Sequence, residues 1–141
     1  MKKKSRKLSV LVMTGLTLYA ANGFSIPAIK KDYTCPIGKE KFSSIDDSPQ
    51  CPTNKFVMFK NEFTKEELKK YEKIINSKEY KAIPQNLPKE YYLGRFYEMA
   101  GGFSDKEIGE TYYKAYIAQI NENFENANTL KESLAKGISY L

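Results

Sequence analysis

The sequence contains no histidine among its 141 residues. This absence removes the commonest general base in enzymes, the Ser-His and Cys-His nucleophile pairs, and every imidazole ligand for a metal. A Gly-rich phosphate loop is also missing, since the Gly-Gly pair at 101–102 lies between two helical patterns rather than after a strand. The carboxylates at 46–47 and at 66–67 are adjacent in sequence, where side chains do not face one another. We therefore expect a protein that is not an enzyme.

Long uncharged runs are absent after residue 23, whereas residues 1–23 have the pattern of a secretory signal peptide. Five positive charges within residues 1–7 precede an uncharged run over 8–21. As a helix this run would span about 21 Å, less than the about 30 Å of a hydrocarbon core. Small residues follow, so we predict cleavage between 21 and 28. The alternative is an uncleaved membrane anchor. We expect a periplasmic protein with no stable membrane span after cleavage.

Positive and negative charges nearly balance once residues 1–23 are removed. The whole chain has 23 basic and 17 acidic residues, a net charge of +6, and removal of residues 1–23 leaves 18 basic residues against 17 acidic ones. The excess of positive charge therefore belongs to the signal, and nucleic acid is not an expected partner. The remaining chain of about 118 residues suits one small domain.

Cysteine is scarce, with Cys35 and Cys51 each opening a Cys-Pro turn. A closed zinc site needs four thiolate or imidazole ligands, usually in two C-x2-C pairs. The trailing positions of these turns hold Gly38 and Asn54, so we expect no metal and no cofactor. In an exported chain we predict a Cys35–Cys51 disulfide, worth about 3 kcal/mol for a loop of about seventeen residues. A zinc site that recruits Asp46, or a redox-active pair, is the alternative.

The mature chain divides into two parts, a ribbon-like head over residues 24–62 and a helical hairpin region over 63–141. In the head, residues 55–59 are the best strand candidate, because aromatic and β-branched residues follow a turn there, and residues 39–42 are a candidate partner strand. We expect an α+β fold, mostly α, in which the disulfide-pinned head precedes three to four antiparallel helices.

Two capping boxes mark helix starts in the second part, Thr64 with Glu67 and Ser104 with Glu107. The sequence "IPQNLP" at 83–88 should end the first helix, and the Gly-Gly pair the second. We expect the third helix to end near residue 121. Apolar residues at helical spacing predict the inward faces: Leu68, Tyr71, Ile74 and Ile75, then Tyr92, Leu93, Phe96, Tyr97 and Ala100, then Ile108, Tyr112, Ala115, Tyr116 and Ile120, and finally Ala127, Leu130, Leu134, Ile138 and Leu141.

Tyrosines occur in two adjacent pairs, at 91–92 and at 112–113. Neighbouring residues on a helix point about 100° apart, so one member of each pair can pack while the other is exposed. Tyrosine anchors interfaces at a low entropy cost. We predict a partner-binding face that contains Tyr91, Arg95 and Tyr113, although packing in the core or at its boundary is the simpler explanation for most tyrosines.

Three segments together resemble an uncharacterised bacterial family: "TCPIGKEKF", "CPTNKFVMFKNEFTKEELKKYEKIINSKEYKAI" and "YYLGRFYEMAGGFSDKEIGETYYKAY". Members of that family open with a Cys-Pro-x-Cys-Gly zinc ribbon and continue into helices similar to tetratricopeptide repeats. The resemblance covers most of residues 33–141. It matches Cys35 and Cys51 to the leading cysteines of the two zinc-binding turns, whereas the trailing cysteines are replaced. It implies a degenerate zinc ribbon.

The resemblance to a tetratricopeptide repeat rests on Leu93, Gly94 and Tyr97, which fit the Leu-Gly-x-x-Tyr core of the repeat's first helix. No 34-residue period recurs, so one repeat-like hairpin with flanking helices is expected. From location and module type we expect a periplasmic adaptor that binds a protein partner in the cell envelope, for example as an accessory to a secretion system. A thiol- or zinc-dependent redox protein and a small secreted inhibitor or immunity-type protein are the alternatives.

Overall fold

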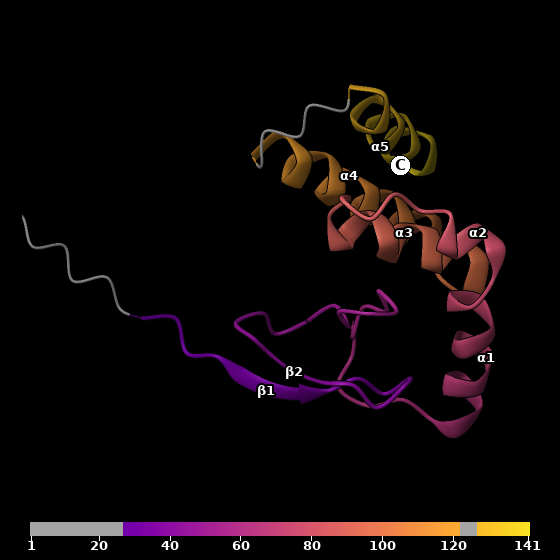
Figure 1. Cartoon of the computed structure of the whole chain (residues 1–141). Helices are drawn as coiled ribbons and strands as arrows, with labels where there is room; N and C mark the ends of the chain where they lie inside the picture. The colour runs from indigo at the N-terminus through magenta and orange to yellow at the C-terminus, as the bar shows by residue number, and fades with distance from the viewer. Residues whose placement is uncertain (1–26, 122–126) are drawn as a thin grey trace, which may run out of the picture.

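The structure, a computed structural model, describes residues 27–121 and 127–141. The described residues form a small antiparallel sheet followed by helices, which confirms the predicted α+β, mostly α fold (Figure 1). The elements are β1 (Lys31–Thr34), β2 (Lys41–Ser44), α1 (Lys65–Ile75), α2 (Lys78–Lys81), α3 (Lys89–Ala100), α4 (Asp105–Asn121) and α5 (Ala127–Tyr140). The signal peptide predicted over 1–23 lies outside the described residues. Within the described ranges, no helix is both long and apolar enough to cross a membrane.

Each Cys-Pro turn folds back on its own flanking residues. In the first turn the Cys35 N–H donates to the carbonyl of Glu40 at 2.8 Å, and β1 pairs antiparallel with β2, with Thr34 opposite Lys41. In the second turn Gln50 forms an isolated bridge with Val57. The predicted pairing of residues 39–42 with 55–59 is therefore wrong. A turn that reverses the chain locally brings its two flanks together before more distant segments can meet.

The helix boundaries follow local capping chemistry. Thr64 caps α1, and its hydroxyl accepts from the Glu67 N–H at 3.2 Å while the Glu67 carboxylate accepts from the Thr64 N–H at 2.9 Å. The predicted first helix is shorter than expected, because α1 ends at Ile75 and Ser77 caps the separate one-turn α2. Gly101, with φ of 66°, ends α3 as predicted.

The head packs on the helices through a cluster of aromatic rings. Phe56, from the second Cys-Pro turn, is fully buried and lies 5.5 Å from the ring of Phe96 on α3. Tyr71 of α1 completes the cluster, with its ring 4.8 Å from that of Phe96. Edge-to-face ring pairs of this kind stabilise a core beyond their buried area. One aromatic cluster therefore joins the head, α1 and α3.

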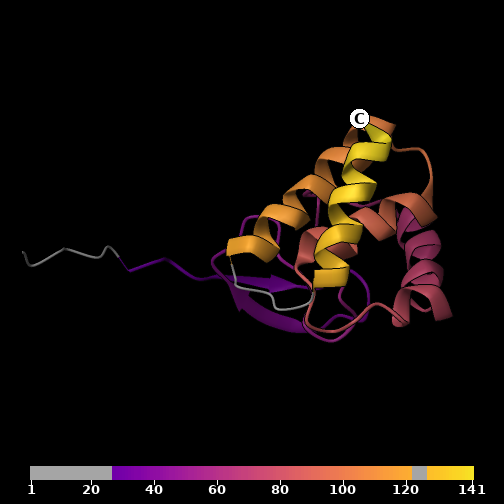
Figure 2. The same ribbon diagram turned by 90° about the horizontal axis from the view of Figure 1, so that it is seen from above.

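Helices α3, α4 and α5 pack in sequence order, and α5 lies beside α4 in both views (Figures 1 and 2). Gly94 allows the close approach of α3 and α4, since a Cβ built there would lie 2.9 Å from the ring of Tyr112. Antiparallel order holds for α4 and α5: Gln119 contacts Ser133, whereas Gly109 lies beside Leu141. The three helices form the scaffold for the candidate site.

Candidate functional site

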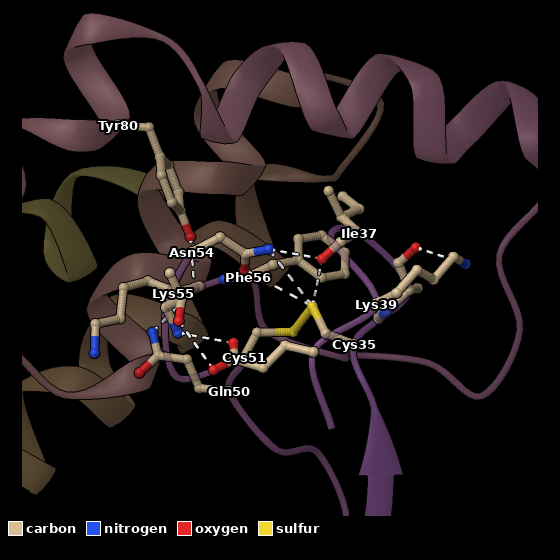
Figure 3. Close-up of a disulfide and its surroundings, with 12 residues drawn as sticks. Cys35, Ile37, Lys39, Gln50, Cys51, Asn54, Lys55, Phe56 and Tyr80 are labelled. Atoms are coloured by element: carbon tan, nitrogen blue, oxygen red, sulfur yellow. Dashed lines mark hydrogen bonds between the residues drawn. A yellow bond between two sulfur atoms is a disulfide. The ribbon is translucent and has the colours of Figure 1, made fainter. Parts of the chain in front are cut away.

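The two Cys-Pro turns are joined at their centre by Cys35 and Cys51, which are fully buried (Figure 3). Their Sγ atoms lie at disulfide distance, 2.11 Å, as the sequence predicts. The turns repeat the same geometry, because the Cys51 N–H donates to the carbonyl of Phe56 at 2.8 Å just as Cys35 bonds to the fifth residue after it. The disulfide therefore links two equivalent hairpin turns.

The trailing positions of these turns do not fit a zinc site. Gly38 has no side chain, and the Nδ2 of Asn54 donates to the carbonyl of Ile37 at 2.8 Å while its Oδ1 accepts from the Phe56 N–H at 3.0 Å. Asp46, the carboxylate that a metal would have to recruit, forms an ion pair with Lys89 on α3. Among the described residues, no group of three or more histidine, cysteine or carboxylate side chains is placed to hold a metal ion.

A groove of about 390 Å³ lies between the second turn and the α1–α2 corner, and its lining includes Asn54, Asn76 and Tyr80. The polar side chains of Asn76 and Tyr80 already form hydrogen bonds within the protein. The Tyr80 hydroxyl donates to the carbonyl of Lys55 at 2.9 Å, and the Asn76 amide donates to the carbonyl of Glu72 at 3.0 Å. Their hydrogen bonds hold the corner of the fold together.

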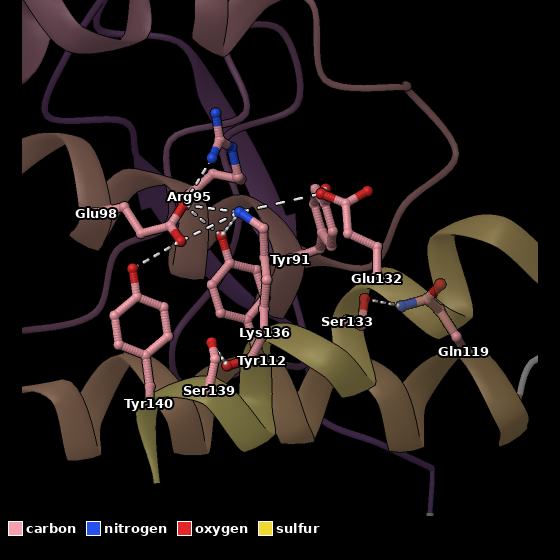
Figure 4. Close-up of polar contacts among 10 residues, drawn as sticks. All are labelled: Tyr91, Arg95, Glu98, Tyr112, Gln119, Glu132, Ser133, Lys136, Ser139 and Tyr140. Carbon is pink, nitrogen blue, oxygen red and sulfur yellow. Dashed lines mark hydrogen bonds and ion pairs between the residues drawn. The ribbon is translucent and has the colours of Figure 1, made fainter.

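The predicted exposure of Tyr91 is wrong. Tyr91 is 5% exposed, and its hydroxyl donates to the Oε1 of Glu132 on α5 at 2.9 Å (Figure 4). Its neighbour Tyr92 is also buried, and its hydroxyl donates to the carbonyl of Pro84. Both members of this pair are covered because α3 has packed neighbours on two sides. In the second pair the prediction holds, with Tyr112 buried and Tyr113 48% exposed.

The Arg95 side chain is half-buried and forms an ion pair within its own helix. Its Nη1 lies 2.7 Å from the Oε2 of Glu98, one turn further along α3. Arg95 is half-buried and Tyr91 is buried, so Tyr113 is the one member of the three predicted partner-binding residues that is exposed.

Sequence reasoning missed Glu98, which is the centre of a polar cluster between α3, α4 and α5 (Figure 4). Its carboxylate accepts from the hydroxyls of Tyr112, at 2.8 Å, and Tyr140, at 3.1 Å, and pairs with Lys136 at 3.1 Å. Burial opposes ionisation, but hydrogen bonds from Tyr112, Lys136 and Tyr140 outweigh it and lower the pKa of Glu98 below its usual value. No short motif marks this cluster, because its members come from three helices.

Helix α5 turns its polar side inward. Ser133 is fully buried and accepts a 2.7 Å hydrogen bond from the Nε2 of Gln119, and Lys136 lies 4.9 Å from the ring centroid of Tyr112. Gly137 packs directly on the backbone of α4, since a Cβ there would lie 3.3 Å from the N atom of Tyr113. The stripe of α5 that the sequence predicts to be inward is consequently rotated partly outward, with Ile138 and Leu141 exposed.

An exposed apolar surface results on the outer side of α4 and α5. We call it the α4–α5 face, and its residues with their exposed fractions are Tyr113 (48%), Ile117 (39%), Ile120 (46%), Ile138 (66%) and Leu141 (73%). The predicted burial of Ile120, Ile138 and Leu141 is wrong. On α5, Ser133 and Gly137 occupy the contact with α4, and Leu141 reaches Gly109 of α4 while most of its side chain stays exposed. Leu130 and Leu134 are half-buried beside the face.

The α4–α5 face is the strongest candidate for a functional surface. Exposed apolar residues scattered singly need no explanation, whereas contiguous ones indicate interaction sites. Tyr113 is the single residue of the predicted partner-binding set that belongs to it. Comparisons with protein-family models, with curated proteins and with solved structures found no match to this chain.

Proposed function

We propose that this protein is a non-enzymatic adaptor of the periplasm that binds a protein partner through the α4–α5 face. One observation carries the proposal: α5 buries Ser133 and Gly137 while Ile138 and Leu141 are exposed. A helix with this orientation loses the burial of two large apolar side chains. Native sequences break the agreement between pattern and burial mainly at functional sites.

The disulfide-linked head supports this role by holding the helices in place. Phe56 follows Cys51 in the second turn and enters the aromatic cluster with α1 and α3. A cross-link in a small exported domain supplies stability that a modest core does not. The family resemblance, with a degenerate ribbon preceding repeat-like helices, is consistent with a binding module. Within this proposal, the protein partner belongs to an envelope-spanning assembly to which this protein is an accessory.

A thiol-exchange function has less support. Exchange needs attack by a thiolate on an accessible sulfur, and both Cys35 and Cys51 are 0% exposed. An inhibitor or immunity-type protein would use the same α4–α5 face on a different kind of partner. The identity of the bound protein distinguishes this role from that of an adaptor.

The test is affinity capture from the envelope fraction with the exported protein and two variants. The double variant Ile117→Gln/Ile138→Gln removes apolar surface from the face, whereas Ile45→Gln removes an isoleucine of similar exposure, 63%, from the head. We expect wild-type protein and the Ile45 variant to retain the same partner, and the double variant to lose it. Equal capture by all three proteins would exclude the α4–α5 face as the binding surface.

A further inference from the structure

Helix α5 adds little to the hydrophobic core. Of its residues whose burial is described, Ser133 and Gly137 alone are buried, and neither has a large apolar side chain. Leu130, Leu134 and Tyr140 are half-buried. Among the described residues, the buried apolar side chains of the core belong to the head and to the segment from α1 to α4. Because burial of apolar surface is the main driving force for packing, the attachment of α5 depends more on hydrogen bonds and ion pairs than that of the other helices.

The Glu98 carboxylate links α5 to both α3 and α4 (Figure 4). Its Oε2 accepts from the Nη1 of Arg95 at 2.7 Å, from the Tyr112 hydroxyl at 2.8 Å and from the Nζ of Lys136 at 3.1 Å. Its Oε1 accepts from the same Nζ at 3.1 Å and from the Tyr140 hydroxyl at 3.1 Å. Lys136 and Tyr140 belong to α5, so this one carboxylate receives two side chains of that helix.

The surroundings of Glu98 suit its ionised form. All four partners donate a hydrogen bond to the carboxylate, and the side chains of Arg95 and Lys136 have no acceptor. A proton on Glu98 would therefore bring an O–H against two groups that cannot accept it. The same proton would remove the negative charge that faces both cations, and charge-assisted hydrogen bonds are about twice as strong as neutral ones.

Two further carboxylates lie near this cluster. Glu132 of α5 accepts from the Tyr91 hydroxyl of α3 at 2.9 Å, and its Oε1 lies 4.0 Å from the Nζ of Lys136. The charge of Asp105, at the start of α4, acts on the Tyr140 hydroxyl. Of these three carboxylates, Glu98 is the one bonded to α3, α4 and α5 together, so its ionisation matters most for the attachment of α5.

Acid should therefore weaken this attachment. Burial opposes ionisation of Glu98, but hydrogen bonds from Tyr112, Lys136 and Tyr140 outweigh it and lower the pKa of the carboxyl. A carboxyl with a depressed pKa stabilises the folded state above its unfolded-state pKa, and this stability is lost as the pH falls through the folded-state value. The loss thus occurs below the pKa of an ordinary glutamate side chain.

A detached α5 would not remain helical. The helix has 14 residues, and isolated helices shorter than about 12–15 residues are marginal in water. Gly137 lowers its helix propensity further. Ile138 and Leu141 would then leave the α4–α5 face, while Tyr113 and Ile117 remain on α4. The two halves of the face are adjacent only while α5 is attached.

We infer that α5 is an acid-sensitive switch: protonation of Glu98 detaches α5 and dismantles the α4–α5 face, while the head and α1 to α4 stay folded. This inference rests on the proposed function and names the regulation of its site. The partner is bound at neutral pH and released in acid.

The test measures access to a thiol placed under α5. Ser133 is fully buried, so the thiol of the variant Ser133→Cys is protected while α5 is attached. Its rate of reaction with dithiodipyridine is divided by that of the variant Ile138→Cys, whose side chain is exposed, to remove the effect of pH on thiol reactivity. Between neutral pH and about pH 3, we expect this ratio to rise at least about tenfold.

Two further substitutions assign the effect to Glu98. Added to Ser133→Cys, Glu98→Gln should raise the ratio at neutral pH, and Glu110→Gln, which removes an exposed carboxylate of α4, should leave it unchanged. Pepsin digestion of the unsubstituted protein in acid, followed by mass spectrometry, provides a measurement without any new thiol. Pepsin should cut α5 before the other helices.

Three results would overturn the inference: a thiol at position 133 that stays protected in acid together with a pepsin-resistant α5, a ratio that Glu98→Gln leaves unchanged, or loss of the near-ultraviolet circular dichroism of the aromatic cluster at the same pH. The last result would indicate unfolding of the whole chain. Envelope capture at neutral pH that depends on Ile117 and Ile138 would support the proposed function in all three cases. Capture that persists in acid after α5 is detached would overturn the link between the switch and binding.

Discussion

Lys136 on α5 and Glu98 on α3 form an ion pair, with 3.1 Å between Nζ and Oε2, that fixes the rotation of α5. Ile138 follows Lys136 by two residues, which is about 200° around the helix. When Lys136 points inward to Glu98, Ile138 must point away from α3. The exposed apolar stripe of α5 is therefore a direct consequence of the buried polar cluster.

The substitution Glu98→Gln should destabilise the protein by about 2 kcal/mol, because hydrogen bonds to a charged acceptor contribute about 1.5–3 kcal/mol. The Glu98 side chain is only 15% exposed, so solvent screening is weak. Urea denaturation measures the loss. The control is the variant Glu110→Gln. The wild-type ion pair of Glu110 with Lys106 is exposed, so its loss should lower the free energy of unfolding by less than about 1 kcal/mol. Equal losses in the two variants would contradict the account.

Acid should release α5 from the other helices. The folded-state pKa of Glu98 is lowered, since hydrogen bonds from Tyr112, Lys136 and Tyr140 outweigh the effect of burial. A carboxyl with a depressed pKa contributes stability that is present above its unfolded-state pKa and is lost as pH falls through the folded-state value. Hydrogen exchange of the α5 amides should show this loss when it is followed as the pH decreases below the pKa of an ordinary glutamate side chain. The Glu98→Gln variant should lack the step, and a step of the same size there would assign it to another group.

Replacement of Gly94 by alanine should lower stability by about 2 kcal/mol. Alanine gains about 1 kcal/mol over glycine in a helix, but its Cβ would lie 2.9 Å from the buried Tyr112 ring. Overpacking of this kind costs up to about 3 kcal/mol. Thermal unfolding of Gly94→Ala measures the net loss, and the same change in a Tyr112→Leu background should cost less. If the effects of Gly94→Ala and Tyr112→Leu on stability were additive, residue 94 and the Tyr112 ring would not be in close contact.

Loss of the disulfide should destabilise the head without creating a metal site. The double variant Cys35→Ser/Cys51→Ser should lose about 3 kcal/mol for a closed loop with a sequence separation of 16. A reductant should lower the melting temperature of wild-type protein and have no effect on the variant. Elemental analysis of the reduced protein should find no bound zinc, since Gly38 and Asn54 supply no thiolate. One equivalent of zinc would contradict this prediction.

Signals that the sequence displays directly predicted the structure well. The capping boxes and the Gly101 stop depend on the chemistry of a few neighbouring residues, and the cysteine pairing depends on there being two cysteines in the chain. The partners of the strands and the rotation of α5 were predicted incorrectly. Each Cys-Pro turn pairs with its own flanks, and Lys136 meets Glu98 across 38 residues. Periodicity locates an apolar stripe but does not show whether a buried ion pair turns that stripe outward.

The central claim, that the α4–α5 face binds a protein, is tested most directly by photocrosslinking in exporting cells. A photoreactive amino acid is placed at position 117 on the face, or at position 45 on the head as the control, where the side chain is also exposed. The account predicts one discrete adduct with another protein from position 117 and none from position 45. Folded, exported protein that forms no adduct at position 117, or the same adduct at both positions, would contradict it.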